Sequence, residues 1–184
     1  MVALFVVLAI IVVLVIVVVS CYNKLVRQRI VTEEAFSTMD VYLKKRFDLI
    51  PNLVETVKGY AAHEKETLAG IVELRSKDYS AMSADEKIQG SRLISRAIPK
   101  IMALAEAYPD LKANANFGQL MGQLEAVEED IANSRKYYNG AVKQYNVTVQ
   151  SIPTNIIAGM FGFTTKKMYE VDDQAQRENV KVEF

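Results

Sequence analysis

The most constraining feature of this sequence is an unbroken run of 18 apolar residues at positions 2–19. Ser20, Cys21 and Tyr22 extend the run without adding a charge. As a helix, about 21 residues rise roughly 31 Å, close to the thickness of the hydrocarbon core of a bilayer. The run is rich in Val and Ile, yet within lipid only a helix pairs its own backbone groups. The sequence therefore predicts a transmembrane helix over residues 1–22, with membrane-anchor residues spread along it: Val2, Leu8, Val13, Val19 and Tyr22.

Three interpretations of this run compete. A cleaved signal peptide has basic residues before a shorter apolar core, and here no basic residue precedes the run. A lipoprotein would carry its lipid on Cys21, anchoring the chain on the outer side of the membrane, but the bulky Val19 and the missing basic segment disfavour this alternative. An uncleaved, single-pass anchor is the favoured interpretation.

The charges beside the run predict its orientation. Lys24, Arg27 and Arg29 follow the apolar residues directly. Basic residues near the end of a span favour the cytoplasmic side. We therefore expect the N-terminus outside and residues 23–184 in the cytoplasm.

The remaining sequence has the apolar spacing of long helices. A first helix covers residues 23–47, and Asp48 with Pro51 predicts a helix boundary or sharp kink near residues 47–50. A second helix is expected over residues 50–77. A third begins at Ser83, where Glu86 completes a capping box, and ends at residues 108–110.

The fourth predicted helix, residues 114–151, has the most regular pattern, with apolar residues three and four positions apart: Phe117, Leu120, Met121, Leu124, Val127, Ile131, Tyr138, Val142, Tyr145 and Val149. Four long amphipathic helices joined by short connections pack best as an antiparallel bundle with coiled-coil-like contacts. The predicted fold is all-α: the N-terminal transmembrane helix is followed by a long antiparallel four-helix bundle over residues 23–152.

The C-terminal segment, residues 153–184, differs from the bundle. It begins with an apolar stretch interrupted by glycines and too short to span a membrane. We expect this stretch to fold back on the bundle, with a contact surface for a partner subunit or for the bilayer interface as the alternatives. Its candidate interaction residues are Ile156, Ile157, Met160, Phe161 and Phe163. Residues 172–184 are polar and predict a mobile or extended arm.

Composition and motifs point away from catalysis. The 22 basic and 22 acidic residues balance, which argues against a nucleic-acid-binding protein. A single Cys and a single His exclude multi-Cys zinc sites and His-pair motifs. Phosphate-binding, dinucleotide-binding and metalloprotease motifs are missing from the sequence. We therefore predict no catalytic residues, no cofactor, no bound metal, no nucleic-acid partner and no small-molecule substrate.

Three charged clusters have alternative interpretations. His63 beside Glu64 and Glu66 resembles half a metal site, but a solvated or hydrogen-bonded histidine is favoured because ligands from other helices would be needed. The acidic cluster Glu125, Glu128, Glu129 and Asp130 is interpreted as a solvated face. Lys44, Lys45 and Arg46 suit phosphate or head-group contact, although their distance from Tyr22 along a helix disfavours lipid.

Several longer motifs resemble the LemA family. They are YNKLV at residues 22–26, KKRFDLIPNLVETVKGYAAHE at 44–64, AEAYPDLKANANF at 105–117 and RKYYNGAVKQYN at 135–146, followed by PTN and a later GF. The resemblance implies a bacterial membrane protein with an N-terminal anchor and a long antiparallel four-helix bundle. It implies no established reaction. Family members are associated with membrane organisation, including one in magnetosome formation.

Two functional hypotheses follow from these observations. In the first, the chain is a non-enzymatic scaffold of the inner membrane that self-assembles as a homo-oligomer at the cytoplasmic face. Anchoring in a plane raises the effective concentration of subunits and favours such assembly. In the second, the chain is an adaptor that binds another membrane protein, such as a protease or a sensor kinase.

Overall fold

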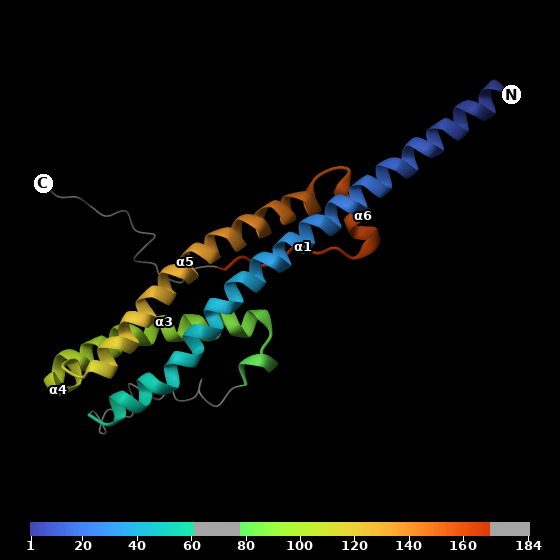
Figure 1. The fold of residues 1–184 in the computed structure, drawn as a ribbon. Coiled ribbons are helices and arrows are strands. Elements are labelled where there is room, and N and C mark those ends of the chain that lie inside the picture. Colours follow the sequence, from blue (N-terminus) through green and yellow to red (C-terminus); the bar gives the residue numbers. More distant parts are fainter. Residues whose placement is uncertain (61–77, 170–184) are drawn as a thin grey trace, which may run out of the picture. The chain divides into compact units, whose positions relative to one another are not determined.

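The computed structural model describes residues 1–60 and 78–169, and within these residues every regular element is helical and none is a strand. Figure 1 shows α1 (Val2–Lys58), the 3-10 turn η1 (Tyr79–Ala81), α3 (Ala84–Ala107), α4 (Pro109–Lys112), α5 (Ala115–Gln150) and α6 (Thr154–Phe161). The all-α class is confirmed for this part of the chain. Most of the predicted second helix and the predicted C-terminal arm lie outside the described residues, so the antiparallel four-helix bundle stays a prediction.

The described residues form two compact units. The first unit is built from Met1–Met39 and Asn133–Met168. The second unit contains the described part of Asp40–Ala132 together with Tyr169. Helices α1 and α5 each supply residues to both units.

Helix α1 is longer than the sequence suggested. It continues to Lys58 with Pro51 inside it, so the helix boundary predicted near residues 47–50 is wrong, and the alternative of a sharp kink there stays a prediction. Proline in a helix interior costs about 3 kcal/mol. Burying an aliphatic side chain contributes about 1.5–3 kcal/mol, and four such side chains lie buried around the proline: Ile50, Leu53, Val54 and Val57. Packing of this face therefore outweighs the cost of Pro51.

Helix α3 begins where the sequence predicts. The Ser83 hydroxyl accepts a hydrogen bond from the Glu86 N–H at 3.3 Å, and the Ser83 N–H donates to Glu86 Oε2 at 2.8 Å. Pro99 lies inside the helix, which ends at Ala107. The short helix α4 that follows was not predicted; Pro109 occupies its first turn, where a missing N–H costs nothing.

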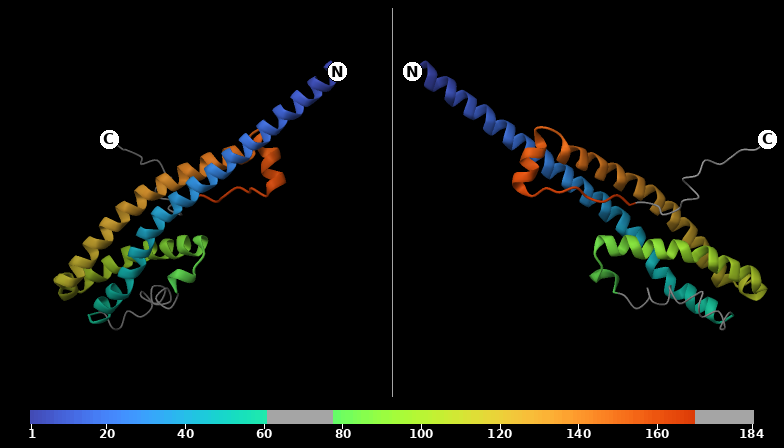
Figure 2. Two further views of the ribbon diagram at one scale, coloured as in Figure 1. Left: turned by 45° about the vertical axis from the view of Figure 1, so that its right-hand side comes forward. Right: turned by 180° about the vertical axis from the view of Figure 1, so that it is seen from behind.

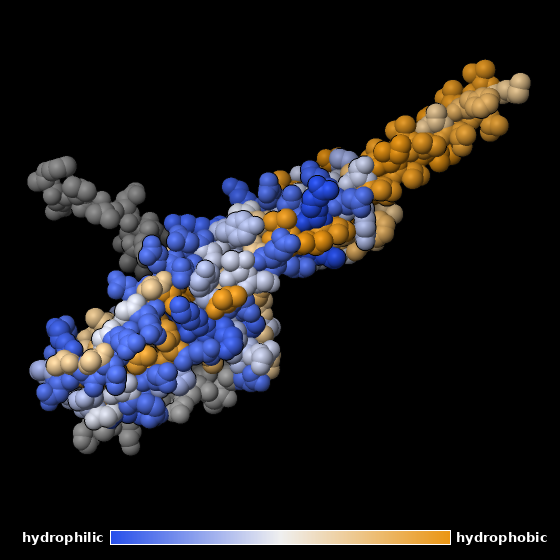
Figure 3. All heavy atoms as spheres, viewed as in Figure 1, coloured by the Kyte–Doolittle hydropathy of each residue, from blue (hydrophilic) through white to orange (hydrophobic). Residues whose placement is uncertain are grey.

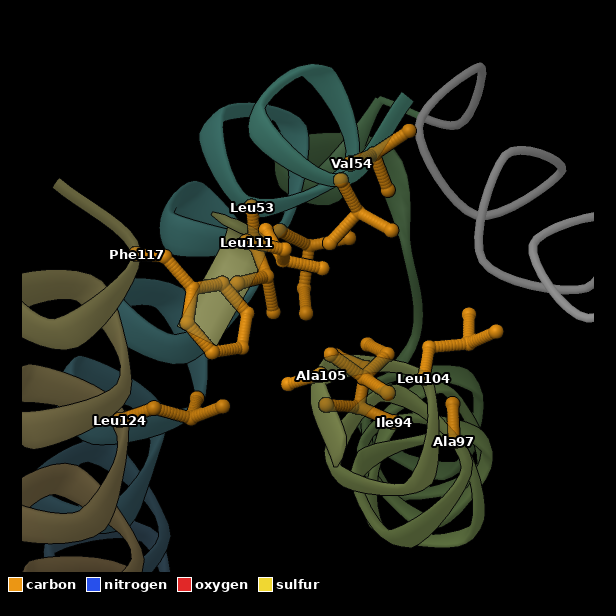
Figure 4. Close-up of a cluster of buried hydrophobic side chains, with 12 residues drawn as sticks. Leu53, Val54, Ile94, Ala97, Leu104, Ala105, Leu111, Phe117 and Leu124 are labelled. Carbon is orange, nitrogen blue, oxygen red and sulfur yellow. The ribbon is translucent and has the colours of Figure 1, made fainter. Parts of the chain in front are cut away.

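The second unit has its core where α1, α3, α4 and α5 meet. Figure 4 shows the Phe117 ring of α5 directed toward Leu53 and Leu111. The buried cluster comprises Ile50, Leu53, Val54, Val57, Ile94, Ala97, Ile101, Leu104, Ala105, Leu111, Phe117 and Leu124.

The first unit packs α1, α5 and α6 together with the segment that follows α6. The views in Figures 1 and 2 agree that α6 lies beside α1, close to the C-terminal end of α5. Its buried cluster is Leu25, Tyr145, Val149, Ile157, Ala158 and Phe163.

Helix α5 confirms the fourth predicted helix. The Asn114 side chain accepts a hydrogen bond from the Phe117 N–H at 3.0 Å, which satisfies a free donor in the first turn. Eight of the ten predicted core positions are buried, and Leu120 and Met121 are partly buried.

Candidate functional site

The apolar N-terminal run is fully exposed in the structure. Among the described helices, α1 alone is long and apolar enough to cross a membrane, and its most apolar window is 0% buried. Figure 3 shows this run as a continuous hydrophobic surface. The anchor residues Val2, Leu8, Val13 and Val19 all lie on it, and Tyr22 marks its end. Within the described part of the chain no residue of this window is buried, and an exposed apolar helix of this length presents the surface that lipid requires.

Helix α6 lies beside the end of this run. The ring centroid of Tyr22 lies 4.9 Å from that of Phe161 and 5.8 Å from that of Phe163, both in edge-to-face geometry. The buried cluster of the first unit extends to Cys21 and Leu25. The place where the apolar run ends is therefore also the place where α6 packs.

Local sequence explains how α6 reaches this position. Thr154 Oγ1 is within hydrogen-bonding distance of the carbonyl oxygens of Thr148 and Ser151, which ties the start of α6 to the end of α5. Gly162 ends the helix with φ of 71°, a left-handed conformation that favours glycine. The Phe163 N–H then donates to Ala158 O at 2.9 Å, which turns the Phe163 ring toward the core.

The five candidate interaction residues fall into two groups. Ile157 and Phe163 are buried in the core of the first unit. The other three stay exposed: Ile156 at 60%, Met160 at 72% and Phe161 at 54%. Ile152, just before α6, is 83% exposed. Helix α6 is therefore apolar on both its inner and its outer face.

The segment after α6 is held by the RKYYNGAVKQYN motif. The Asn146 amide donates to Lys166 O at 2.8 Å and its carbonyl accepts from the Lys166 N–H at 2.8 Å. The Tyr138 hydroxyl donates to Lys167 O at 3.1 Å. Lys166 Nζ reaches Thr32 Oγ1 at 3.0 Å, which ties the segment to α1. The polar residues of this motif therefore fix the backbone that leads away from α6.

We expect Asn146→Ala to release this segment. The substitution removes two hydrogen bonds to the Lys166 backbone, which together contribute about 1–2 kcal/mol. Amide exchange at Lys166 should accelerate roughly tenfold, since 1.4 kcal/mol corresponds to a factor of ten. Hydrogen-exchange mass spectrometry measures this, with Gln144→Ala on the exposed side of α5 as the control. Equal exchange in the two variants would contradict the assigned role of Asn146.

The charge of the first unit is strongly biased. Its only acidic residues are Glu33 and Glu34. Its basic residues number eight: Lys24, Arg27, Arg29, Arg135, Lys136, Lys143, Lys166 and Lys167. Residues 131–169 contain no Asp or Glu, so the sequence around α6 carries positive charge alone. The unit that holds the apolar run is therefore suited to anionic lipid head groups.

The second unit contains a buried arginine that the sequence did not reveal. Arg46 is 1% exposed. Its Nη1 donates to Ser91 Oγ at 2.7 Å, its Nη2 donates to Ser95 Oγ at 2.9 Å, and Nη2 also pairs with Glu128. Burial lowers the pKa of Arg46, and the Glu128 carboxylate opposes this change. Tyr169 completes the network by donating to Ser91 Oγ at 3.2 Å.

This network corrects two interpretations made from the sequence. Arg46 does not form a surface phosphate patch with its neighbours, because its guanidinium lies inside the second unit. Lys44 pairs instead with Asp48, at 2.7 Å. Glu128 is not merely part of a solvated face, since it neutralises Arg46, whereas Glu125 and Glu129 are exposed as expected.

A smaller polar cluster joins η1 to α1 and α3. The Tyr79 hydroxyl donates to Asp40 Oδ1 at 2.6 Å, and Lys87 Nζ lies 2.8 Å from Asp40 Oδ2. Burial, followed by the bond to Asp40, raises the pKa of Tyr79. The described residues hold no group of three or more His, Cys, Asp or Glu that suits a metal ion. His63, Glu64 and Glu66, for which a solvated or hydrogen-bonded histidine is favoured over half a metal site, lie outside the described residues.

Comparison with known proteins gives consistent matches. The sequence model of the LemA family matches residues 35–184. The chain is 25% identical over 175 residues to magnetosome protein MamQ 2 of Paramagnetospirillum magneticum, covering 81% of this chain and 64% of the relative. It is 27% identical over 138 residues to protein LemA of Metamycoplasma hominis, covering 74% and 63%. The chain thus spans slightly less than two thirds of the length of these relatives.

Proposed function

Because the chain belongs to the LemA family, we propose that it is a non-enzymatic structural protein that is anchored in a bacterial inner membrane and self-assembles at the cytoplasmic face. The observation that carries this proposal is the continuity of α1. The same unbroken helix supplies the exposed apolar run and, from Leu25 to Met39, the buried face of the first unit. Membrane attachment and packing of the first unit are therefore properties of one element.

Anchoring of this kind favours assembly. Chains that share a membrane move in two dimensions, so contacts too weak for association in solution become effective. Lateral contacts are proposed for the second unit. Exposed apolar side chains are present in the second unit at Val41, Leu93 and Met102.

The matched relatives support a structural role. Relatives from Paramagnetospirillum magneticum and Magnetospirillum gryphiswaldense are named magnetosome proteins. Those names, together with the family's association with membrane organisation, favour shaping or supporting a membrane over chemistry on a small molecule. The basic residues that follow the apolar run favour the cytoplasmic side for the helical units.

Mass photometry of the protein excised from a lipid bilayer in nanodiscs tests self-assembly, because the proposed contacts depend on confinement in a membrane. The full-length chain is expected to form a discrete assembly, whereas a chain that starts at Ser20 should be monomeric. Ser20 is the appropriate start because Cys21 and Tyr22 pack against the first unit and must remain. A third variant replaces residues 2–19 by a Leu–Ala helix of equal length, and it should still assemble if anchoring alone is required.

Two outcomes would contradict this proposal. If the full-length chain is monomeric in detergent and in lipid nanodiscs, self-assembly is wrong. If it purifies with one different membrane protein in equal amount, the adaptor function replaces the scaffold function.

A further inference from the structure

We propose that the outer face of α6 inserts into the lipid head-group region, so that the chain contacts the bilayer through the transmembrane span and through a second, interfacial helix. This inference rests on the membrane anchoring in the proposed function and is independent of self-assembly.

The first argument concerns depth. Tyr22 ends the predicted transmembrane helix, and aromatic residues at the end of a span sit at the boundary between lipid and water. The Phe161 ring lies 4.9 Å from the Tyr22 ring in edge-to-face contact. Contact with Tyr22 therefore places the end of α6 at the boundary of the bilayer.

The second argument concerns the exposed surface of α6. The helix sequence TNIIAGMF contains no charged residue. Its inner face already packs through Ile157 and Ala158, yet Ile156, Met160 and Phe161 point outward and are more than half exposed. An apolar helix at the membrane surface that buries one face in protein and offers the other to acyl chains has the features of an interfacial helix.

The third argument identifies lipid, rather than a second copy of this chain, as the occupant. Residues 1–32 and 131–169 contain no Asp or Glu, so two copies that met through α6 would bring positive charge against positive charge. Anionic head groups provide the complementary charge. Lys24 and Arg27 are exposed just beyond Tyr22, and the Arg29 guanidinium lies 5.3 Å from the Phe163 ring centroid.

Tryptophan fluorescence offers a direct test because the chain contains no Trp. Met160→Trp places the single indole on the outer face of α6, where the native side chain is 72% exposed. Tyr137→Trp is the matched control, on an exposed position of α5 in the same unit. Each full-length variant is reconstituted in vesicles of phosphatidylcholine and anionic phosphatidylglycerol, with or without bromine on the acyl chains.

Brominated lipid should reduce the fluorescence of Met160→Trp about twofold or more, because an interfacial helix buries its apolar face roughly 5–10 Å into the head-group and acyl boundary. Tyr137→Trp should be unaffected by bromine and should be quenched by aqueous iodide. Circular dichroism verifies that both variants are folded.

Three results would overturn the inference. If iodide quenches both variants equally and bromine quenches neither, α6 faces water. If the indole of Met160→Trp is shielded from iodide without bromine quenching, and dilution in lipid removes the shielding, a second copy covers α6. If the chain fails to float with vesicles in a density gradient, anchoring itself is wrong and the proposed function fails too. Flotation without bromine quenching leaves the proposed function intact.

Discussion

Glu128→Gln is expected to lower the free energy of unfolding by about 2–3 kcal/mol, because removing one partner of a buried ion pair leaves the other charge uncompensated. Arg46 keeps its permanent charge and is 1% exposed, so water cannot replace the lost carboxylate. The expected loss of stability lies at the lower end of the range for buried ion pairs, because the Glu128 side chain is itself 38% exposed. The hydrogen bonds from Arg46 to Ser91 and Ser95 remain, but neither hydroxyl carries a charge.

Urea unfolding followed by circular dichroism measures this loss, and Glu125→Gln is the matched control. Glu125 is exposed, one helical turn before Glu128 on α5, and its substitution should change stability by less than about 0.5 kcal/mol. The double variant Arg46→Met with Glu128→Leu should recover much of the loss, because an apolar pair carries no buried charge. Equal losses for Glu125→Gln and Glu128→Gln would show that the ion pair is not formed in solution.

The second large effect is expected from Ile94→Ala, which should lower the free energy of unfolding by about 3 kcal/mol. Truncating a buried aliphatic side chain to Ala usually lowers it by about 2–5 kcal/mol. Ile94 is 1% exposed in the core of the second unit, where α3 faces α1 and α5. The adjacent Leu93 is 46% exposed, so Leu93→Ala should change stability by less than about 0.5 kcal/mol.

The same urea titration compares the two substitutions. They remove similar apolar groups from consecutive residues of α3, so the difference between them reports which face of the helix is buried. A larger loss for Leu93→Ala than for Ile94→Ala would mean that α3 is rotated relative to the structure.

Helix ends and helix faces could be predicted from the sequence where the determining interactions are local. The Ser83–Glu86 capping box spans three residues, and it fixed the start of α3 correctly. The apolar repeat of α5 likewise identified its buried face, from Phe117 to Val149. Both signals lie within a few residues of the structure they specify.

Features that depend on distant residues could not be predicted. Pro51 is a helix breaker by local rules, and only the core that forms around Leu53 and Val54 explains why α1 continues through it. In the sequence, Arg46 resembles part of a basic surface run. Its partners Ser91 and Glu128 are on other helices, so their contacts with Arg46 could not be inferred from the local sequence.

The candidate interaction residues were predicted as a group but not by face. The division between buried Ile157 and Phe163 and exposed Ile156, Met160 and Phe161 depends on where α6 begins and ends. Gly162 sets that end with its positive φ, and the Phe163 N–H that follows it donates to Ala158 O.

The unbroken passage of α1 from the apolar run into the first unit also fixes an angular phase. Successive residues of an α-helix are about 100° apart around its axis, and Tyr22 and Leu25 are locked against α6 and α5. Each side chain between Val2 and Val19 therefore has a defined angular position around the helix axis relative to α6. Wherever the apolar run lies in lipid, the direction in which each of its side chains faces is fixed relative to α6.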